Sequence, residues 1–150
     1  MSMLWLASDR VYPFGLVMKE SPVPFVVKAA LGSEARAGLL SFNERTMYRG
    51  KDIRVHDKIF VFSSENQGGN GLCAKGVVTS VDRGPGSRLT IEVRPVATAR
   101  QNLGRRELKP FRDLADNQPQ TEIARKLYRQ ATDKIAHVSE EAAAFLNTHF

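Results

Sequence analysis

Cysteine is nearly absent from this chain, since Cys73 is its only thiol among 150 residues. A single cysteine forms no intramolecular disulfide and supplies too few ligands for a structural zinc site, and this usage fits a reducing compartment. Cys73 stands between Leu72 and Ala74 inside a strand-like run. We therefore interpret it as a packed core residue rather than a nucleophile.

Long apolar runs are also absent. No segment approaches the roughly 18 consecutive apolar residues that a membrane-spanning helix needs. The N-terminal stretch MSMLWLASDRVYPFGLVM has no basic first region, and Asp9, Arg10 and Pro13 interrupt its apolar residues. We therefore expect no signal peptide, and a soluble, cytoplasmic protein without a membrane partner.

Most catalytic and metal-binding signatures are missing as well. The glycine-rich stretch GGNG at 68–71 is not followed by a helical pattern, so it is not a dinucleotide-binding fingerprint. The histidines, His56, His137 and His149, lack the spacing of metal ligands. We therefore expect no cofactor and no metal, and a binding module rather than an enzyme.

Positive charge is what the chain has in excess. Lysine and arginine number 22 against 16 acidic residues, which gives a net charge of +6 and a pI near 9.8. The excess is uneven, because one acid, Glu107, stands among six basic residues at Arg94, Arg100, Arg105, Arg106, Lys109 and Arg112. Such clustering favours an anionic partner, and nucleic acid, either DNA or RNA, is the one we expect.

Strand patterns dominate the middle of the chain. The runs KIFVFSS (58–64), GLCAKGVVTSVD (71–82) and SRLTIEVRPVA (87–97) follow one another across short turns, which predicts an antiparallel meander. Residues 3–7 are expected to add a strand. We predict a single α+β domain over residues 1–150, a small and mostly antiparallel β-barrel with short helices around it.

Helices and loops are expected around this sheet. The run FVVKAAL (25–31) predicts a short helix that ends at Gly32, and residues 42–50 predict a polar and aromatic loop. Apolar residues recur every four positions over 121–138, which predicts one helix with Thr121 as its N-cap. A last helix is expected after Ser139, again an N-cap.

These segments, in this order, resemble the PUA-like superfamily, and within it the EVE, ASCH and YTH-type domains. The resemblance covers residues 3–95 and is carried by Trp5 in an early strand, Asn43 and Arg45 in the next loop, the turn 55–57, and the strands 60–64 and 71–78. It implies a small β-barrel with a concave pocket. In such domains the pocket takes a flipped or unpaired nucleobase, often a modified one.

A base pocket needs flat surfaces for stacking and a few polar groups for the base edge. We expect stacking from Trp5, Phe14, Phe42 and Tyr48, and edge contacts from Asn43, Ser63, Ser64 and Asn66. Phosphate contacts are expected from Arg45, Arg49, Lys51, Arg100, Arg105 and Arg106. Glu65 would repel phosphate, so we expect it to orient Arg45 or a backbone amide.

Two other functions stay open. Some ASCH-type proteins are nucleases or hydrolases of modified nucleosides, and a lysine within hydrogen-bond reach of Glu44 or Glu65 would favour such an enzyme. Arginines dispersed evenly over the surface would instead favour a protein-interaction or ligand-sensing domain. The proposed pocket residues also have structural interpretations, because Trp5 and Phe42 can serve packing and the two serines can satisfy backbone groups.

Overall fold

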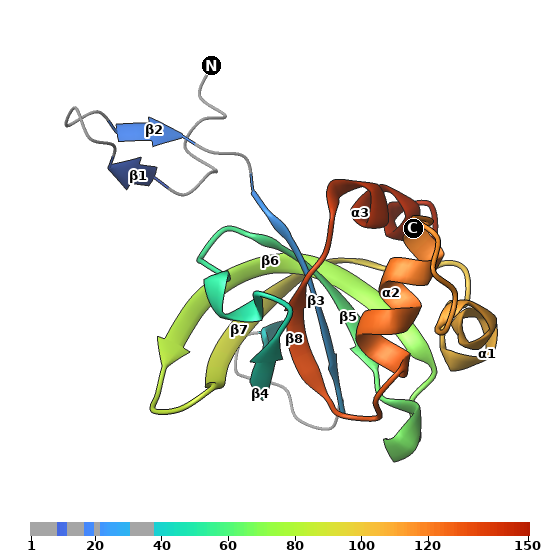
Figure 1. Cartoon of the computed structure of the whole chain (residues 1–150). Coiled ribbons are helices and arrows are strands. Elements are labelled where there is room, and N and C mark those ends of the chain that lie inside the picture. The colour runs from blue at the N-terminus through green and yellow to red at the C-terminus, as the bar shows by residue number, and fades with distance from the viewer. Residues whose placement is uncertain (1–8, 12–16, 20–21, 31–37) are drawn as a thin grey trace.

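The computed structural model describes residues 9–11, 17–19, 22–30 and 38–150. A closed barrel in the strand order β3-β5-β6-β7-β4-β8 forms the body of the fold (Figure 1). Its strands are β3 (Pro24–Ala29), β4 (Leu40–Met47), β5 (Lys58–Ser63), β6 (Gly71–Arg83), β7 (Arg88–Thr98) and β8 (Lys134–His137). Two short strands, β1 (Asp9–Val11) and β2 (Val17–Lys19), pair with each other in a separate two-stranded sheet.

The predicted meander is confirmed, because β5, β6 and β7 pair as consecutive antiparallel neighbours. The barrel also contains two parallel pairs, β3 with β5 and β4 with β8. The sheet is therefore mixed, although antiparallel pairs outnumber parallel ones. The expected strand at residues 3–7 lies outside the described residues, and the single domain over 1–150 stays a prediction.

The helix predicted over residues 25–31 is wrong, because Pro24–Ala29 form β3. Every residue of this strand is buried, so apolar side chains stand on both of its faces. The alternation of apolar and polar residues that marks a half-exposed strand is therefore missing. The loop predicted over residues 42–50 is also wrong over most of its length. Residues up to Met47 belong to β4, which pairs with β7 from Leu40 to Arg45.

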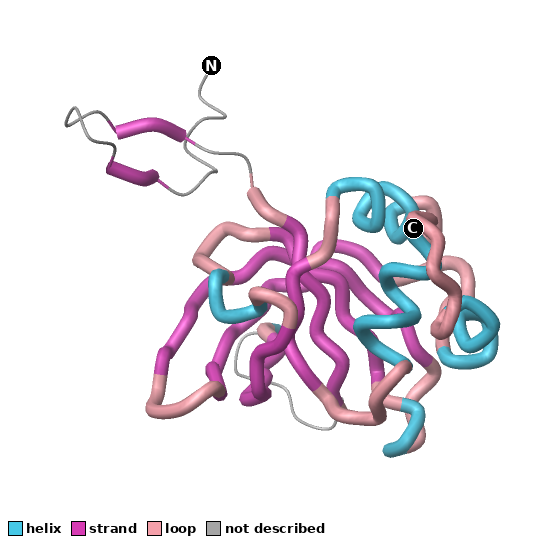
Figure 2. Tube along the Cα trace, in the orientation of Figure 1, coloured by secondary structure: helices cyan, strands magenta, loops and turns pink. Residues whose placement is uncertain are grey.

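Helices cover one side of the barrel (Figure 2). They are α1 (Arg105–Leu108), α2 (Pro119–Tyr128) and α3 (Glu140–Asn147). The short 3-10 helices are η3 (Gly50–Asp52), η4 (Glu65–Gln67) and η5 (Lys109–Phe111), and η3 lies away from the three α-helices, on the other side of the barrel in Figure 2. The helix predicted over 121–138 is right for α2 and wrong for β8, which closes the barrel between β3 and β4. The N-cap of α2 is Gln118 rather than Thr121, because Pro119 occupies the first turn.

Alternation along the strands separates two cores. Side chains such as Phe25 and Val27 of β3 fill the barrel interior, whereas Val26 faces the helices. Phe60 and Phe62 of β5 likewise pack under the helices, together with Leu127 of α2. Lys28 follows Val26 on the same face of β3, which places a lysine at the edge of the helix-covered core.

The N-cap of the last helix is confirmed as Ser139. Its Oγ accepts a hydrogen bond from the Ala142 amide at 3.0 Å and donates one to Glu122 Oε1.

We expect Ser139→Ala to lower the free energy of unfolding by about 1–2 kcal/mol, because the cap is lost and the Glu122 carboxylate loses a donor. Urea denaturation measures this difference. Ser139→Thr keeps the hydroxyl and serves as the matched control, and equal stability of Ser139→Ala and the wild type would contradict the assignment.

Candidate nucleic-acid interface

The end of β5 and the turn after it are held by backbone hydrogen bonds. The Ser64 amide donates to the Ala29 carbonyl at 2.9 Å, and the Ser64 carbonyl accepts from the Gly69 amide at 2.8 Å. A Cβ at Gly69 would lie 2.1 Å from Ser63 Oγ, so only glycine fits this close approach. Ser64 is buried, and its Oγ has no hydrogen-bond partner in the described part of the chain.

Glu65 joins three elements at this strand end. Its carboxylate accepts hydrogen bonds from the Tyr128 hydroxyl at 3.0 and 3.2 Å, and from the Arg105 amide at 2.7 Å. The expectation that Glu65 orients a backbone amide is therefore confirmed, and that amide belongs to Arg105. A Cβ at Gly104 would lie 2.4 Å from Glu65 Oε2, so α1 approaches η4 closely only because Gly104 has no side chain.

Asn66 fixes the guanidinium of Arg105. Its Oδ1 accepts from Arg105 Nη2 at 2.5 Å, and its Nδ2 donates to the Ala131 carbonyl at 3.4 Å. Gln67 adds a hydrogen bond to Asp133 at 3.2 Å. The turn after β5 is thus tied both to α1 and to the segment between α2 and β8.

A cavity of about 330 Å³ opens among these elements, and we name it the cationic cleft. It is lined by Lys28, Asn66, Arg105, Lys109, Arg112, Tyr128, Arg129 and Ala131. Five of these eight residues are lysine or arginine, and none is a carboxylate. Outside the lining, Asp113 is 3.7 Å from Arg112 and 3.9 Å from Arg129. The other three cations have no ion pair within the described residues.

Lys28 is the buried cation of this cleft. The residue is 1% exposed, its Nζ lies 5.1 Å from the centre of the Tyr128 ring, and it has no hydrogen bond or ion pair within the described residues. Burial lowers the pKa of Lys28, and the nearby Arg105 acts in the same direction, whereas Asp133 and Glu65 oppose it. The amine is therefore held in a surrounding that disfavours its charge.

Lys134 lies directly beside Lys28, because the two are partners in the antiparallel pair of β3 and β8. Its Nζ donates to the carbonyls of Lys126 at 3.0 Å and Gln130 at 3.5 Å, at the C-terminal end of α2. Burial, followed by repulsion from Lys28, lowers the pKa of Lys134 to about 8. Two buried amines thus lie next to each other at one end of the barrel.

Tyr128 completes the floor of the cleft with a neutral hydroxyl. Burial raises its pKa, and the Glu65 carboxylate raises it further by charge and by accepting the hydroxyl proton. The phenol therefore stays protonated and acts as a donor to Glu65. Its ring, only 6% exposed, packs against the Lys28 amine.

A second and larger hollow of about 650 Å³ adjoins the cleft, since Arg105 and Lys109 line both. We name it the polar hollow. Its lining consists of Glu65, Gly69, Asn70, Asn102, Gly104, Arg105, Arg106, Glu107 and Lys109. Asn70 and Asn102 are exposed side-chain amides that make no hydrogen bond within the described residues. Such amides offer both donors and acceptors to a ligand.

The structure brings together only part of the residue set predicted from the sequence. Asn66, Arg105 and Arg106 line the two hollows, and Ser63 and Ser64 stand at the end of β5 next to them without lining either. Trp5 and Phe14 lie outside the described residues. The remaining predicted residues, Phe42, Asn43, Tyr48, Arg45, Arg49, Lys51 and Arg100, line neither hollow.

These other residues have structural partners of their own. Phe42 is 3% exposed inside the barrel, so its ring belongs to the interior core. Asn43 on β4 donates to Thr90 Oγ1 at 2.6 Å and accepts from Arg88 Nε at 2.9 Å. Arg45 is exposed on the same strand, opposite Arg88. The Arg100 amide donates to the carbonyl of His149 near the C-terminus.

Tyr48, Arg49 and Lys51 lie toward the opposite end of the barrel. The Tyr48 carbonyl accepts from the amide of His137, whereas the cationic cleft adjoins the other end of β8 at Lys134. Tyr48 and Arg49 both have positive φ angles, 52° and 65°. Because β8 rises about 3.3 Å per residue, roughly 10 Å of strand separates its two ends.

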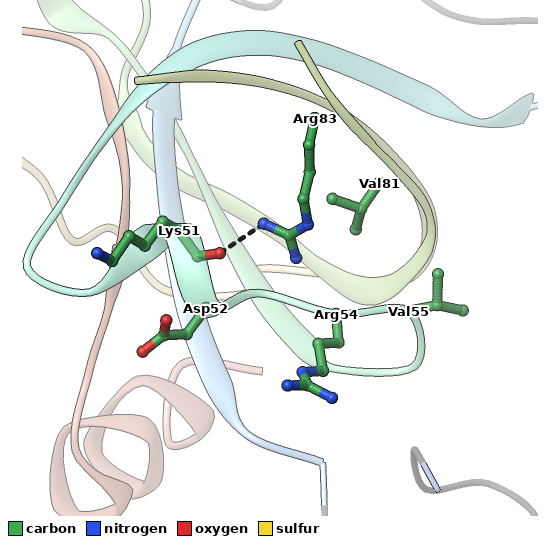
Figure 3. A pocket seen from close by; sticks show the side chains of 6 residues that line it. All are labelled: Lys51, Asp52, Arg54, Val55, Val81 and Arg83. Atoms are coloured by element: carbon green, nitrogen blue, oxygen red, sulfur yellow. Dashed lines mark hydrogen bonds between the residues drawn. The ribbon is translucent and has the colours of Figure 1, made fainter. Parts of the chain in front are cut away.

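Lys51 borders a separate cavity of about 480 Å³ (Figure 3). Arg83 crosses this cavity, and its guanidinium donates to the carbonyls of Lys51 at 2.6 Å and Ile53 at 2.5 Å. Arg83 therefore joins β6 to the segment around η3. Arg54 also lines this cavity and is exposed, which makes it a useful control position for tests of the cationic cleft.

Neither Glu44 nor Glu65 has a lysine within hydrogen-bond reach among the described residues, which is the contact that would favour an enzyme. Glu44 lies 3.9 Å from Arg88, and Glu65 is bound to Tyr128 and Arg105. Cys73 donates to the Val61 carbonyl at 3.4 Å, and burial raises the pKa of its thiol, as expected for a packing residue.

Two other kinds of site have no candidate among the residues that the structure describes. No group of three or more histidine, cysteine, aspartate or glutamate residues is arranged to hold a metal ion there. None of the described helices is both long and apolar enough to cross a membrane.

Lys28, Lys134 and Tyr128 were not predicted as site residues. The run FVVKAAL was interpreted as a helix, which hid the fact that its single lysine shares a strand face with Val26. A charged residue in the middle of an otherwise apolar run was the available signal, because a lysine is almost never fully buried without a reason.

No protein-family model and no curated protein matches this sequence. Among solved structures, the crystal structure of the DUF55 domain of human thymocyte nuclear protein 1 is similar, with a TM-score of 0.56 at 10% sequence identity. The match covers 83% of this chain and 96% of that domain. At this identity the likeness concerns the fold alone, and it agrees with the closed barrel and its short helices. The chain therefore shares the fold of that domain, a small closed α+β barrel with short helices around it.

Proposed function

We propose that this protein is a nucleic-acid-binding module whose cationic cleft holds the phosphate backbone. The observation that carries the proposal is the lining of that cleft, which has five cationic residues and no carboxylate. Such a concentration of like charge destabilises the unbound protein, and a polyanion would relieve the repulsion. The resemblance to PUA-like domains, which implies nucleic-acid binding, supports the same partner.

The polar hollow is where we place an unpaired or flipped nucleobase, whether modified or not. Its volume of about 650 Å³ falls within the range of ordinary ligand pockets. Asn70 and Asn102 offer donors and acceptors for the base edge, and the Arg106 guanidinium offers a planar group for stacking. Ser63, Ser64 and Asn66 support this hollow at the end of β5, and stacking by Trp5 and Phe14 stays a prediction.

We expect binding of single-stranded DNA or RNA that weakens steeply as salt rises. Each phosphate contact that is lost should reduce the slope of log K against log salt by about 0.7. The variant Arg105→Gln/Lys109→Gln should therefore bind about 10-fold or more weakly near 0.1 M salt and show a slope smaller by about 1.4. Fluorescence anisotropy with labelled oligonucleotides measures both quantities.

The matched control is Lys51→Gln/Arg54→Gln, which removes the same charge at the separate cavity of Figure 3. It should leave the slope within about 0.3 of the wild-type value, since distant exposed charges are screened within about 10 Å. The proposal fails if no oligonucleotide binds at low salt, or if the control weakens binding as much as the cleft variant does.

A further inference from the structure

The floor of the cationic cleft is made by two buried residues, Lys28 and Tyr128, which are 1% and 6% exposed. The hydroxyl of Tyr128 is already bound to Glu65. The amine of Lys28 has no hydrogen-bond acceptor among the described residues, although it lines the cavity. A lysine whose side chain is buried and whose amine meets solvent only through a cavity is poorly solvated, and it points to an anionic ligand that reaches the floor.

The other two unpaired cations of the cleft lie on α1 and η5, on the side shared with the polar hollow. Arg105 is held by Asn66 through its guanidinium and by Glu65 through its amide, so its position is fixed before any ligand binds. Lys109 follows one turn later and has no ion pair within the described residues. With Lys28, these residues present donors from three elements to one small volume.

The shape of the cleft discriminates between two kinds of phosphate. A diester inside a strand carries one negative charge and continues on both sides, so it cannot reach a floor that buried residues close. A terminal monoester continues on one side only and carries about −1.5 to −2 charges near pH 7. It therefore fits a small cavity of about 330 Å³ and satisfies more of the unpaired cations.

We propose that the cationic cleft binds the terminal phosphate of a nucleic-acid strand, with the Lys28 amine contacting it from the floor. This inference rests on the proposed function and specifies its ligand. The nucleotide that carries the phosphate then extends past Arg105 and Lys109 into the polar hollow, where Asn70 and Asn102 meet its base.

The test compares three versions of one labelled oligonucleotide, which carry a 5′-phosphate, a 3′-phosphate or hydroxyl groups at both ends. The label is placed internally so that both ends are free, and a DNA and an RNA series are measured at the same salt. We expect one phosphorylated end to bind at least about 10-fold more tightly than the hydroxyl-ended strand. Which end it is identifies the polarity of the bound strand.

Lys28→Met should reduce this preference to less than about 2-fold, whereas the control Arg54→Gln should keep it. A cooperative thermal transition is the check that Lys28→Met is folded. Equal binding of all three oligonucleotides by the wild type would overturn the inference and leave the proposed function standing. A preference that persists in folded Lys28→Met would overturn the role of Lys28, and a failure of every oligonucleotide to bind would overturn both proposals.

Discussion

Lys28→Met is expected to make the protein more stable, by about 1–3 kcal/mol in the free energy of unfolding. The wild-type side chain is buried, its amine has no acceptor among the described residues, and it lies beside Lys134, its partner in the antiparallel pair of β3 and β8. Methionine has a similar length, no charge, and a thioether that packs well against the Tyr128 ring. A lysine that served only the fold would give the opposite result, because removing it would destabilise the protein.

Thermal denaturation measures this effect, with an expected rise in Tm of roughly 2–4 °C for each kcal/mol. Lys51→Met is the control, because Lys51 is exposed and its replacement should change stability by less than about 0.5 kcal/mol. Loss of more than about 1 kcal/mol in Lys28→Met would show that the amine stabilises the fold, and the argument for a missing anion would then fail.

The pH dependence of stability gives a second measurement of the same lysine pair. Both pKa values lie below the ordinary 10.5, that of Lys134 at about 8, so between pH 8 and 10 the unfolded chain binds more protons than the folded one. Stability therefore rises with pH in this window. Asp133, Glu65 and Arg105 also act on Lys28, and they are unchanged in the variant. The rise of stability with pH should be smaller in Lys28→Met, because the Lys28 amine then no longer repels the Lys134 amine.

The parts of the fold that local patterns determine were predictable. The meander β5–β6–β7 joins neighbours in sequence, and its turns are marked by glycine and polar residues. Ser139 followed by two glutamates is likewise a local signal for a helix start. The misassigned segments are those whose partners are distant in sequence. β3, β4 and β8 become strands because the barrel pairs them with one another, β3 also with β5 and β4 also with β7, and these pairings leave no mark in a short window of sequence.

The candidate site, like the fold, was predictable only where a local sequence pattern marks its residues. Asn66 and Arg105 were found because a polar turn after a buried strand and a cluster of arginines are both visible in the sequence. That Glu65 would bind Tyr128, 63 residues away, was not visible, since α2 reaches the end of β5 only in the folded barrel. Lys28 was hidden by the helix assignment, and with it the floor of the cationic cleft.

Glu65→Ala is expected to cost about 2–4 kcal/mol, which is the largest loss among the substitutions considered. It removes the acceptor of the Tyr128 hydroxyl, a group that is buried and that has no other hydrogen bond among the described residues. A buried donor without an acceptor costs about 1–3 kcal/mol by itself. The Arg105 amide loses its acceptor as well, so the contact between η4 and α1 weakens.

Tyr128→Phe separates these contributions, because it removes the hydroxyl and keeps the ring under the Lys28 amine. Tyr128→Phe alone should lower the free energy of unfolding by about 1 kcal/mol. When Glu65→Ala is added to Tyr128→Phe, its further effect should be about 1–2 kcal/mol smaller than in the wild type, because no hydroxyl is left without an acceptor. Urea denaturation of the four proteins gives this coupling free energy. Strict additivity would mean that the Tyr128–Glu65 hydrogen bond contributes nothing. Glu65 would then stabilise α1 alone, and the floor of the cleft would owe its shape to packing rather than to this contact.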